Sequence, residues 1–282
     1  MQLLSRDDID SARAIVRGQV GATATHRWPL LDARIGATAF VKHENHTALG
    51  AFKLRGGVVY LHELVRREPR VRGVVSATRG NNGQSIARAA AHHGLTATIV
   101  VPHGNSLEKN AAMRALGAEL IEHGDDFQAA SEHAAALAER HGLHRVPSFH
   151  RDLVRGVTSY WLEFFEQVQP DVVLVPIGMG SGIAGCANAR AHLGVATRIV
   201  GVVSAHATAI KDSFVARQVV EAPVTTLLAD GLACRLPDGD ALQLMLREVD
   251  DIIAVTDDEV AEAMRIYFSD THNVAEGAGA AP

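Results

Sequence analysis

The pattern that most limits the possible folds is a regular alternation of short apolar segments with longer amphipathic ones. The short segments have the composition of buried strands, and the longer ones repeat apolar residues at helical spacing. This order predicts an α/β protein with mostly parallel sheet covered by helices. The predicted strands are residues 39–43, 73–77, 96–101, 119–122, 172–177, 198–203 and 251–255. The predicted helices are residues 7–18, 52–68, 82–93, 107–116, 126–141, 151–167, 181–192, 208–216 and 257–269.

The ends of several predicted helices carry recognisable chemistry. Thr256 and Glu259 stand at the spacing of a capping box, in which a hydroxyl and a carboxylate bond the free amides of a helix start. Glycines follow three predicted helices, as left-handed stop residues do. These glycines are Gly94, Gly117 and Gly142.

Composition excludes several classes of protein. Hydrophobic residues make up 47% of the 282 residues and charged residues 21%, which is typical of a chain with a packed core and not of a disordered one. The formal net charge of −5 gives no reason to expect nucleic acid as a partner. Cys186 and Cys234 have no metal-binding spacing, and we expect both to be reduced and buried.

Two stretches bear on where the protein resides. The first residues carry charges every few positions and lack the apolar core of a signal peptide. Residues 172–189 contain no charged side chain, but Pro176 and four glycines identify a strand, a loop and a helix start rather than a membrane span. We therefore expect a cytoplasmic protein with no membrane partner.

A glycine-rich turn follows the predicted strand at 172–177. Residues 178–185 read Gly-Met-Gly-Ser-Gly-Ile-Ala-Gly and lead into a helix. Glycines let the backbone approach a ligand closely, and amides at a helix N-terminus bind phosphate. The alternative is a tight turn without a ligand, but four glycines in eight residues favour a phosphate site.

The same turn matches the GxGxxG dinucleotide fingerprint over residues 180–185. That fingerprint also requires an acidic residue at the end of the next strand, to hold a ribose hydroxyl. The next strand, residues 198–203, runs into Ser204, Ala205 and His206, which offer no carboxylate. An NAD-dependent oxidoreductase therefore stays an alternative that the sequence does not favour.

Lysine is scarce, so an amine nucleophile has few candidates: Lys42, Lys53, Lys109 and Lys211. Lys53 lies among small and apolar neighbours, and an amine desolvated in this way suits imine chemistry. We expect the head of Lys42 to reach solvent and the other two lysines to lie on polar helix faces. The alternative for Lys53 is a surface lysine at a helix start.

A third segment, residues 76–84, reads Ser-Ala-Thr-Arg-Gly-Asn-Asn-Gly-Gln and joins a buried strand to a helix. Its amides could bind a carboxylate, and Asn81 could orient a hydroxyl on an aromatic cofactor. The alternative is an ordinary capped helix start. Together the three segments call for a ligand with a phosphate, a carbonyl that takes an amine, and a carboxylate.

In this order the segments resemble the pyridoxal-phosphate (PLP) enzymes of the tryptophan-synthase-β fold, PLP fold type II, and within them the threonine/serine dehydratase family. The match begins with Lys-His-Glu-Asn at residues 42–45 and Gly-Ala-Phe-Lys-Leu-Arg-Gly at residues 50–56. It extends through residues 79–84, 176–185, 229–231 and 276–279, over nearly the whole chain. Within the family the sequence is most similar to the hydroxyectoine-utilisation dehydratase branch.

The resemblance implies a role for each site residue. Lys53 would be the Schiff-base lysine, Phe52 would flank the cofactor ring, and Asn81 would bond the ring hydroxyl. The residues implied to hold the cofactor phosphate are Gly178, Met179, Gly180, Ser181 and Gly182. The residues implied to form the substrate-carboxylate loop are Thr78, Arg79, Gly80, Asn81 and Asn82. The implied reaction eliminates the β-hydroxyl of a threonine- or serine-like amino acid to give a 2-oxo acid and ammonia.

The resemblance also implies the organisation of the chain. A small domain, residues 50–148, would be inserted into a larger cofactor-binding domain made of residues 1–49 and 149–282, and the protein would be a homodimer. The family continues for some tens of residues with a Ser or Cys that contacts the pyridine nitrogen. We therefore expect the C-terminal end of the large domain to be truncated at Pro282.

Departures from the family pattern refine the expected reaction. Leu54 after Lys53, where the cysteine-synthase branch has Asp, favours elimination over replacement. Arg79 takes the position of the acid/base serine of serine racemases, which argues against racemisation. We expect the Arg79 side chain to contact either an extra anionic group on the substrate or solvent. Residues 204–209 offer no carboxylate for a racemase-type divalent cation, so we predict no metal. A metabolite-binding protein without turnover is the non-enzymatic alternative.

Overall fold

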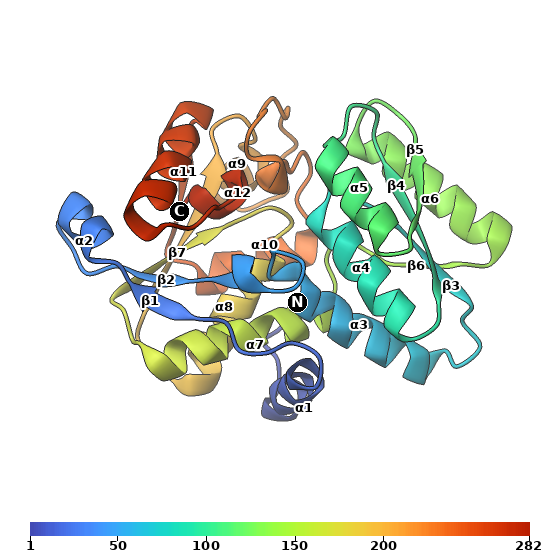
Figure 1. The fold of residues 1–282 in the computed structure, drawn as a ribbon, viewed down its shortest axis with the longest axis horizontal. Coiled ribbons are helices and arrows are strands. Elements are labelled where there is room, and N and C mark those ends of the chain that lie inside the picture. The colour runs from blue at the N-terminus through green and yellow to red at the C-terminus, as the bar shows by residue number, and fades with distance from the viewer. The chain divides into compact units, whose positions relative to one another are not determined.

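The computed structural model describes residues 1–282 and divides into two compact units (Figure 1). The first unit comprises Met1–Ile9, Ala22–His46 and Val157–Pro282, and the second comprises Asp10–Gly21 and Thr47–Gly156. The insertion expected at residues 50–148 falls within the second unit, which also takes in residues 10–21 and extends to residue 156.

The second unit is built on a four-stranded parallel sheet of order β5-β4-β3-β6. Its strands are β3 (Gly73–Ala77), β4 (Thr96–Val101), β5 (Glu119–Glu122) and β6 (His144–Arg145). Its helices are α3 (Lys53–Arg67), α4 (Asn81–His92), α5 (Leu107–Ala115) and α6 (Phe127–His141). Helix α1 (Arg6–Arg17) joins this unit from residue 10 onward.

The two-residue period of β3 divides the core of the second unit into two layers. Val74 packs in a buried cluster with Leu61 of α3 and Ile86 of α4. Its neighbour Val75 points to the opposite face, where it packs in a cluster with Ala134 of α6. Helices therefore cover both faces of the sheet, and its central strands are buried on both sides.

Helix α1 belongs to the second unit because of its apolar stripe. Val16 and Val20 of this helix region are buried in one cluster with Leu54 and Val58 of α3. The stripe follows the helical period, so it presents one continuous face to α3. This packing is why residues 10–21 belong to the second compact unit.

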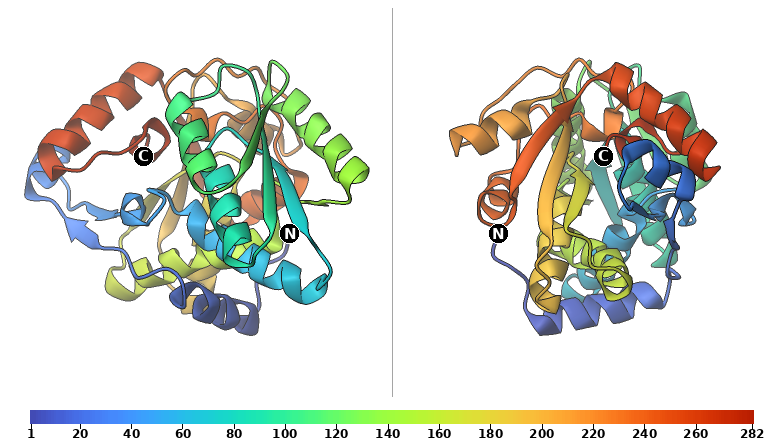
Figure 2. Two further views of the ribbon diagram at one scale, coloured as in Figure 1. Left: turned by 45° about the vertical axis from the view of Figure 1, so that its right-hand side comes forward. Right: turned by 90° about the vertical axis from the view of Figure 1, so that its left-hand side faces the viewer.

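The first unit contains a three-stranded parallel sheet of order β7-β8-β9 and a small antiparallel pair, β1-β2 (Figure 2). The sheet strands are β7 (Val172–Pro176), β8 (Arg198–Ser204) and β9 (Asp251–Val255), and the pair is β1 (Thr25–Arg27) and β2 (Phe40–Lys42). Its helices include α2 (Pro29–Ile35), α8 (Ser181–Leu193), α9 (Ala209–Ala216), α10 (Gly239–Glu248), α11 (Asp257–Thr271) and α12 (Gly277–Ala280). Helix α7 (Arg151–Gln167) lies mostly in this unit.

Short elements account for the difference between the predicted and observed secondary structure. Strands β1 and β6 have three and two residues, and helices α2 and α12 have seven and four, too few to show a period. The ten-residue helix α10 was also missed. The predicted strand at residues 39–43 does exist as β2, but it pairs antiparallel with β1. No helix of the chain is long and apolar enough to cross a membrane.

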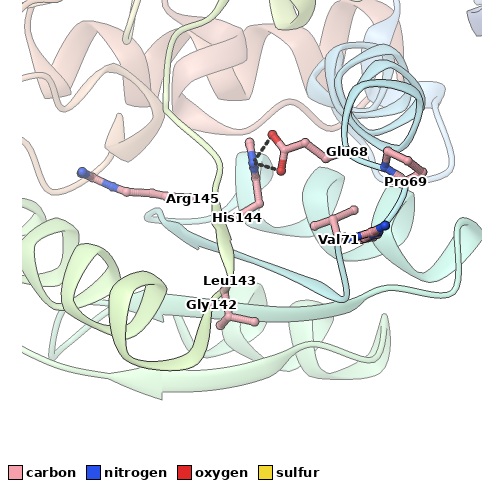
Figure 3. A pocket seen from close by; sticks show the side chains of 8 residues that line it. Glu68, Pro69, Val71, Gly142, Leu143, His144 and Arg145 are labelled. Carbon is pink, nitrogen blue, oxygen red and sulfur yellow. Dashed lines mark hydrogen bonds and ion pairs between the residues drawn. The ribbon is translucent and has the colours of Figure 1, made fainter.

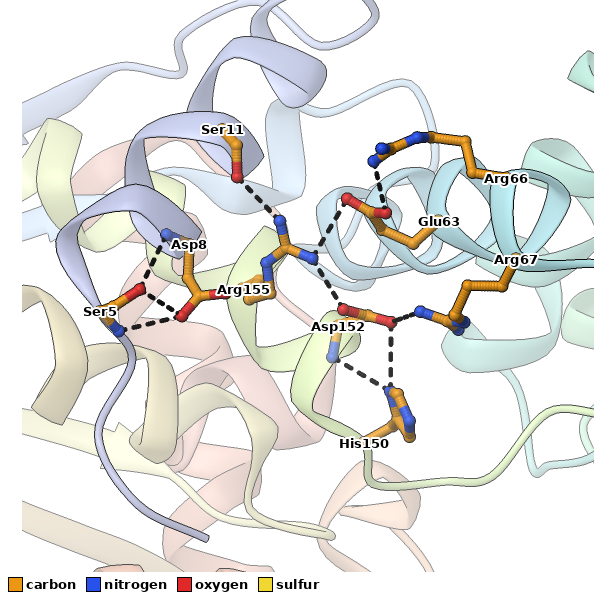
Figure 4. Close-up of polar contacts among 9 residues, drawn as sticks. All are labelled: Ser5, Asp8, Ser11, Glu63, Arg66, Arg67, His150, Asp152 and Arg155. Atoms are coloured by element: carbon orange, nitrogen blue, oxygen red, sulfur yellow. Dashed lines mark hydrogen bonds and ion pairs between the residues drawn. The ribbon is translucent and has the colours of Figure 1, made fainter.

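A buried ion-pair network joins α1, α3 and α7 within the second unit (Figure 4). Arg155 donates to Glu63 Oε1 at 3.2 Å, to Asp152 Oδ1 at 2.8 Å and to Ser11 Oγ at 2.8 Å. Arg67 donates to the other oxygen of Asp152 at 2.6 Å. Burial by itself raises the pKa of Asp152, but the hydrogen bonds from Arg67 and Arg155 outweigh it and hold this pKa below its ordinary value.

Candidate active site

Lys53 is the first residue of α3 and is fixed by contacts on both sides of it. Before it, Thr47 Oγ1 donates to Ala51 O at 2.9 Å and accepts from Ala51 N at 3.0 Å, which locks the preceding turn. After it, Ser85 Oγ of α4 donates to the Lys53 carbonyl at 2.6 Å. The Lys53 amine lies 5.0 Å from the centre of the Phe52 ring. The lysine is therefore half-buried at a helix start with its backbone held by a neighbouring helix.

Ser85 can reach this carbonyl because α3 and α4 approach each other closely. A Cβ added at Gly57, one turn after Lys53, would lie 2.2 Å from Ser85 Oγ and 3.0 Å from Ser85 O. Only glycine fits at this position without moving α4. Sequence reasoning missed Ser85, and the glycine one helical turn beyond Lys53 was the available signal of a close helix contact.

The surroundings of the other lysines separate them from Lys53. The Lys42 amine donates to Glu163 Oε2 at 2.7 Å and to Thr23 O at 2.8 Å. Its side chain is only 6% exposed, so the expectation that its head reaches solvent was wrong. The carboxylate on α7 that pairs with it is distant in sequence, which is why the local pattern did not reveal it. The Lys42 amine is therefore held in an ion pair with Glu163.

The predicted carboxylate loop connects β3 to α4. Thr78 N donates to Val100 O at 3.0 Å, and Thr78 Oγ1 accepts from Gly80 N at 3.0 Å, so the turn is fixed by its own hydroxyl. Gly80 is the N-cap of α4 and supplies no side-chain cap. This 12-residue helix thus starts without a capping side chain at the end where its dipole favours an anion.

Two donors in this loop are buried without a hydrogen-bond partner in the chain: Arg79 Nε and Asn82 Nδ2. Buried polar atoms are nearly always paired, and an unpaired one indicates a missing partner. Both atoms are donors, so the missing partner is an acceptor. This pattern fits a carboxylate, which is what the sequence predicted for the loop.

The predicted phosphate loop connects β7 to α8 in the first unit. Gly180 is the N-cap of α8, adopts a left-handed conformation with φ 95° and supplies no side-chain cap. Trp161 Nε1 of α7 donates to Gly182 O at 2.9 Å and so fixes the first turn of the helix. A Cβ at Gly178 would lie 2.3 Å from Gly231 O, because the segment around residue 231 runs directly against the loop. Sequence reasoning did not identify Trp161 as a support of this loop.

The dinucleotide interpretation of the same loop gains no support from β8. The strand ends at Ser204, whose Oγ accepts from His206 N at 3.1 Å in a closed turn. No carboxylate stands at this strand end, as the sequence indicated.

A surface depression lies elsewhere, at the C-terminal end of α3 (Figure 3). It has a volume of about 650 Å³, and His144 at its wall contacts Glu68 at 3.1 Å and Tyr60 Oη at 2.8 Å. A helix of 15 residues is roughly 22 Å long, so this depression and Lys53 are at opposite ends of α3. It plays no part in the site built on Lys53.

Both cysteines are buried and free, as predicted. Burial raises the pKa of Cys186 well above its ordinary value, and burial also raises the pKa of Cys234, to about 12. Neither thiol is therefore a nucleophile at neutral pH.

Comparison with known proteins places these features in context. The model of the family described as pyridoxal-phosphate dependent enzyme matches residues 16–282. An L-threonine ammonia-lyase of Thermotoga maritima is 32% identical over 281 residues, which cover 99% of this chain and 70% of the relative. The catabolic L-threonine dehydratase TdcB of Escherichia coli K12 is 31% identical and is covered to 84%.

Solved structures agree with these sequence matches. A threonine deaminase from T.th. superposes with a TM-score of 0.91 at 30% identity, over 99% of this chain and 91% of that one. Maize serine racemase superposes with a TM-score of 0.93 at 26% identity, over 99% of this chain and 85% of that one.

Proposed function

Since the chain belongs to the family of pyridoxal-phosphate-dependent enzymes and is a lyase of the threonine ammonia-lyase type, we propose that it eliminates the β-hydroxyl of a hydroxy-amino acid to give a 2-oxo acid and ammonia. The observation that carries the proposal is Lys53 at the start of α3, held by Ser85, in a unit that also presents the uncapped N-terminus of α4.

The residues present fit the cofactor. The backbone of Gly178, Met179, Gly180, Ser181 and Gly182 would hold the phosphate. The 13-residue helix α8 starts at a left-handed glycine without a side-chain cap, and both its N-terminal amides and its dipole favour a phosphate there. A side chain at Gly178 would collide with Gly231 O, so the loop is confined to glycine there. Phe52 would lie against the ring and Asn81 would bond its hydroxyl.

The substrate would be oriented by its α-carboxylate at α4. The amides at the start of α4 and the unpartnered Asn82 Nδ2 are donors for that group. Thr78 would fix the turn through its bond to Gly80 N. Bound PLP would withdraw the electron pair left at Cα, which makes the Cα proton removable by a protein base.

The Lys53 amine would then move that proton. In its free form this amine would accept the Cα proton of the substrate as a general base. The C–O bond at the β carbon would then break, and the hydroxyl would leave as water with the proton that the Lys53 amine took from Cα. The product is an enamine, which takes up water and releases ammonia to leave the 2-oxo acid. Atoms balance with no oxidant or reductant.

The variant Lys53→Ala tests this assignment. We expect loss of the visible absorbance of covalently bound PLP and at least about a thousandfold loss of ammonia release. Lys211→Ala, which changes a lysine on α9, is the matched control and should retain both. If Lys53→Ala keeps both properties, the assignment is wrong.

The same purified protein separates the alternatives. Bound PLP without ammonia release from any hydroxy-amino acid would favour a metabolite-binding protein, and tight binding of NAD(H) would favour an oxidoreductase. A cytoplasmic location stays a prediction from the sequence, and a homodimeric assembly rests on the family resemblance. A substrate of the hydroxyectoine-utilisation type also stays a prediction.

A further inference from the structure

Arg79 differs from the two arginines of the buried ion-pair network in the second unit. Arg67 and Arg155 are paired with carboxylates, whereas Arg79 forms no ion pair and its Nε is buried without a hydrogen-bond partner. The side chain as a whole is half-buried, which excludes a freely solvated surface arginine. A buried donor with no acceptor is costly, which favours a bound ligand as the partner of this Nε.

The position of Arg79 indicates that this partner is part of the substrate. It lies between the carboxyl end of β3 and the start of α4, the edge of a parallel sheet at which ligands bind. Under the proposed function the α4 amides and Asn82 bind the α-carboxylate of the substrate. The side chains of serine and threonine have no group that a guanidinium could bind besides the departing hydroxyl. Arg79 would therefore remain without an anionic partner for either substrate.

The charges of the residues around this loop also favour an anionic ligand. Residues 76–88 contain no aspartate or glutamate. A Cβ at Gly80 would lie 2.3 Å from Lys109 Cδ, so the stem of a second basic side chain crosses the loop. A guanidinium presents a planar fork that matches a carboxylate with two parallel hydrogen bonds.

We propose that the substrate is a β-hydroxy amino acid with a second carboxylate, of the 3-hydroxyaspartate class, and that Arg79 binds this second carboxylate and determines specificity. The inference rests on the proposed function and names its substrate. In a four-carbon diacid only the Cα and Cβ atoms separate the two carboxylates, so adjacent donors on one loop can bind both groups.

Ammonia release by the PLP-loaded protein tests specificity. We expect kcat/KM for one stereoisomer of 3-hydroxyaspartate to exceed that for L-threonine and L-serine by at least about tenfold. Arg79→Ala should lower kcat/KM for the diacid by roughly 10- to 100-fold and lower the ratio of kcat/KM for the diacid to that for L-threonine by at least about tenfold. Arg79→Lys keeps the positive charge without the planar fork, so its kcat/KM for the diacid should lie between the values of the wild type and of Arg79→Ala. Arg88→Ala, an exposed arginine on α4, is the control.

A binding measurement gives a readout that does not depend on turnover. L-aspartate and L-alanine lack the β-hydroxyl, so their binding is followed by the absorbance change of bound PLP. The wild-type protein should bind L-aspartate at least about tenfold more tightly than L-alanine, and Arg79→Ala should remove the difference. Thermal unfolding of each variant confirms that the fold is retained.

The outcomes separate this inference from the proposed function. Ammonia release from L-threonine or L-serine that exceeds release from every 3-hydroxyaspartate isomer overturns the inference and leaves the proposed function standing. An equal loss for diacid and threonine in Arg79→Ala also overturns it. If no hydroxy-amino acid releases ammonia, the proposed function fails, and the ratio of L-aspartate to L-alanine binding still decides whether Arg79 selects a second carboxylate.

Discussion

At the scale of single residues, His43 occupies an aromatic cluster in which burial sets its charge. Its side chain packs against Trp28, His26 and His46, and the rings of His43 and His46 stack at 4.8 Å. Burial lowers the pKa of His43 to about 4, with a smaller contribution from the charge of His46. Trp28 Nε1 donates to His43 Nε2 at 3.1 Å, which requires that nitrogen to be unprotonated.

This arrangement predicts acid sensitivity. The folded pKa of His43 lies below the unfolded value of about 6.5, so the unfolded chain binds more protons between these values and the free energy of unfolding falls as the pH drops from about 6.5 to 4. The expected loss is roughly 3 kcal/mol. Urea unfolding followed by tryptophan fluorescence at pH 7 and pH 4 measures it.

The variant His43→Gln isolates this contribution. Glutamine can accept the Trp28 hydrogen bond without titrating, so the drop in stability between pH 7 and pH 4 should shrink. His141→Gln changes an exposed histidine and should leave the drop as it is in the wild type. An unchanged pH dependence in His43→Gln would show that other groups cause the acid sensitivity.

At the scale of elements, the Arg155 network ties three helices together through buried charges. Arg155→Ala leaves Glu63 and Asp152 each short of one partner in a site where their side chains are about one-tenth exposed or less. Removing one partner of a buried ion pair costs about 3–5 kcal/mol. We expect a loss of that size in the free energy of unfolding, measured with denaturant.

Arg66→Ala is the matched control because Arg66 also pairs with Glu63, at 2.9 Å, but from a side chain that is 66% exposed. An exposed pair of this kind contributes at most about 1 kcal/mol. Equal effects of the two substitutions would mean that the buried network does not stabilise the helix contact.

The contact of α3 with α4 carries a second prediction at this scale. Gly57→Ala places a methyl group 2.2 Å from Ser85 Oγ and 3.0 Å from the Ser85 carbonyl oxygen. Relief of this clash moves Ser85 away from the Lys53 carbonyl, so we expect a loss of about 1–3 kcal/mol in stability together with weaker PLP binding.

The control for this substitution is Gly239→Ala, where the added methyl group meets nothing within 4 Å. Denaturant unfolding and PLP titration of both variants give the comparison. Wild-type PLP affinity in Gly57→Ala would contradict the claim that the two helices together position Lys53.

Local signals predicted most elements correctly. The capping box of Thr256 and Glu259 is present, and Gly94, Gly117 and Gly142 are left-handed with φ of 68°, 87° and 63°. Strands β3, β4, β5 and β9 begin and end at the predicted residues. These features depend on neighbours within a few positions, and such interactions are readable in a sequence.

At the scale of the whole molecule, the α/β class and PLP fold type II predicted from the sequence are confirmed. Each unit has a parallel sheet of its own, and the loops that carry the carboxylate and phosphate motifs stand at the carboxyl ends of parallel strands. The roles assigned to Lys53, Asn81 and the glycine loop stay predictions that the proposed experiments address. The position of residues 10–21 follows from the apolar stripe on α1 and the α3 surface that it covers.

The sequence by itself determined most of the longer elements, the family and the motif residues, because periodicity, caps and glycine turns act over short stretches of chain. Only the tertiary structure decided that Lys42 is paired with Glu163, that Ser85 holds Lys53, and that Arg79 has a buried donor without a partner. Each of these depends on side chains from distant segments and on exclusion of water, neither of which a local pattern encodes.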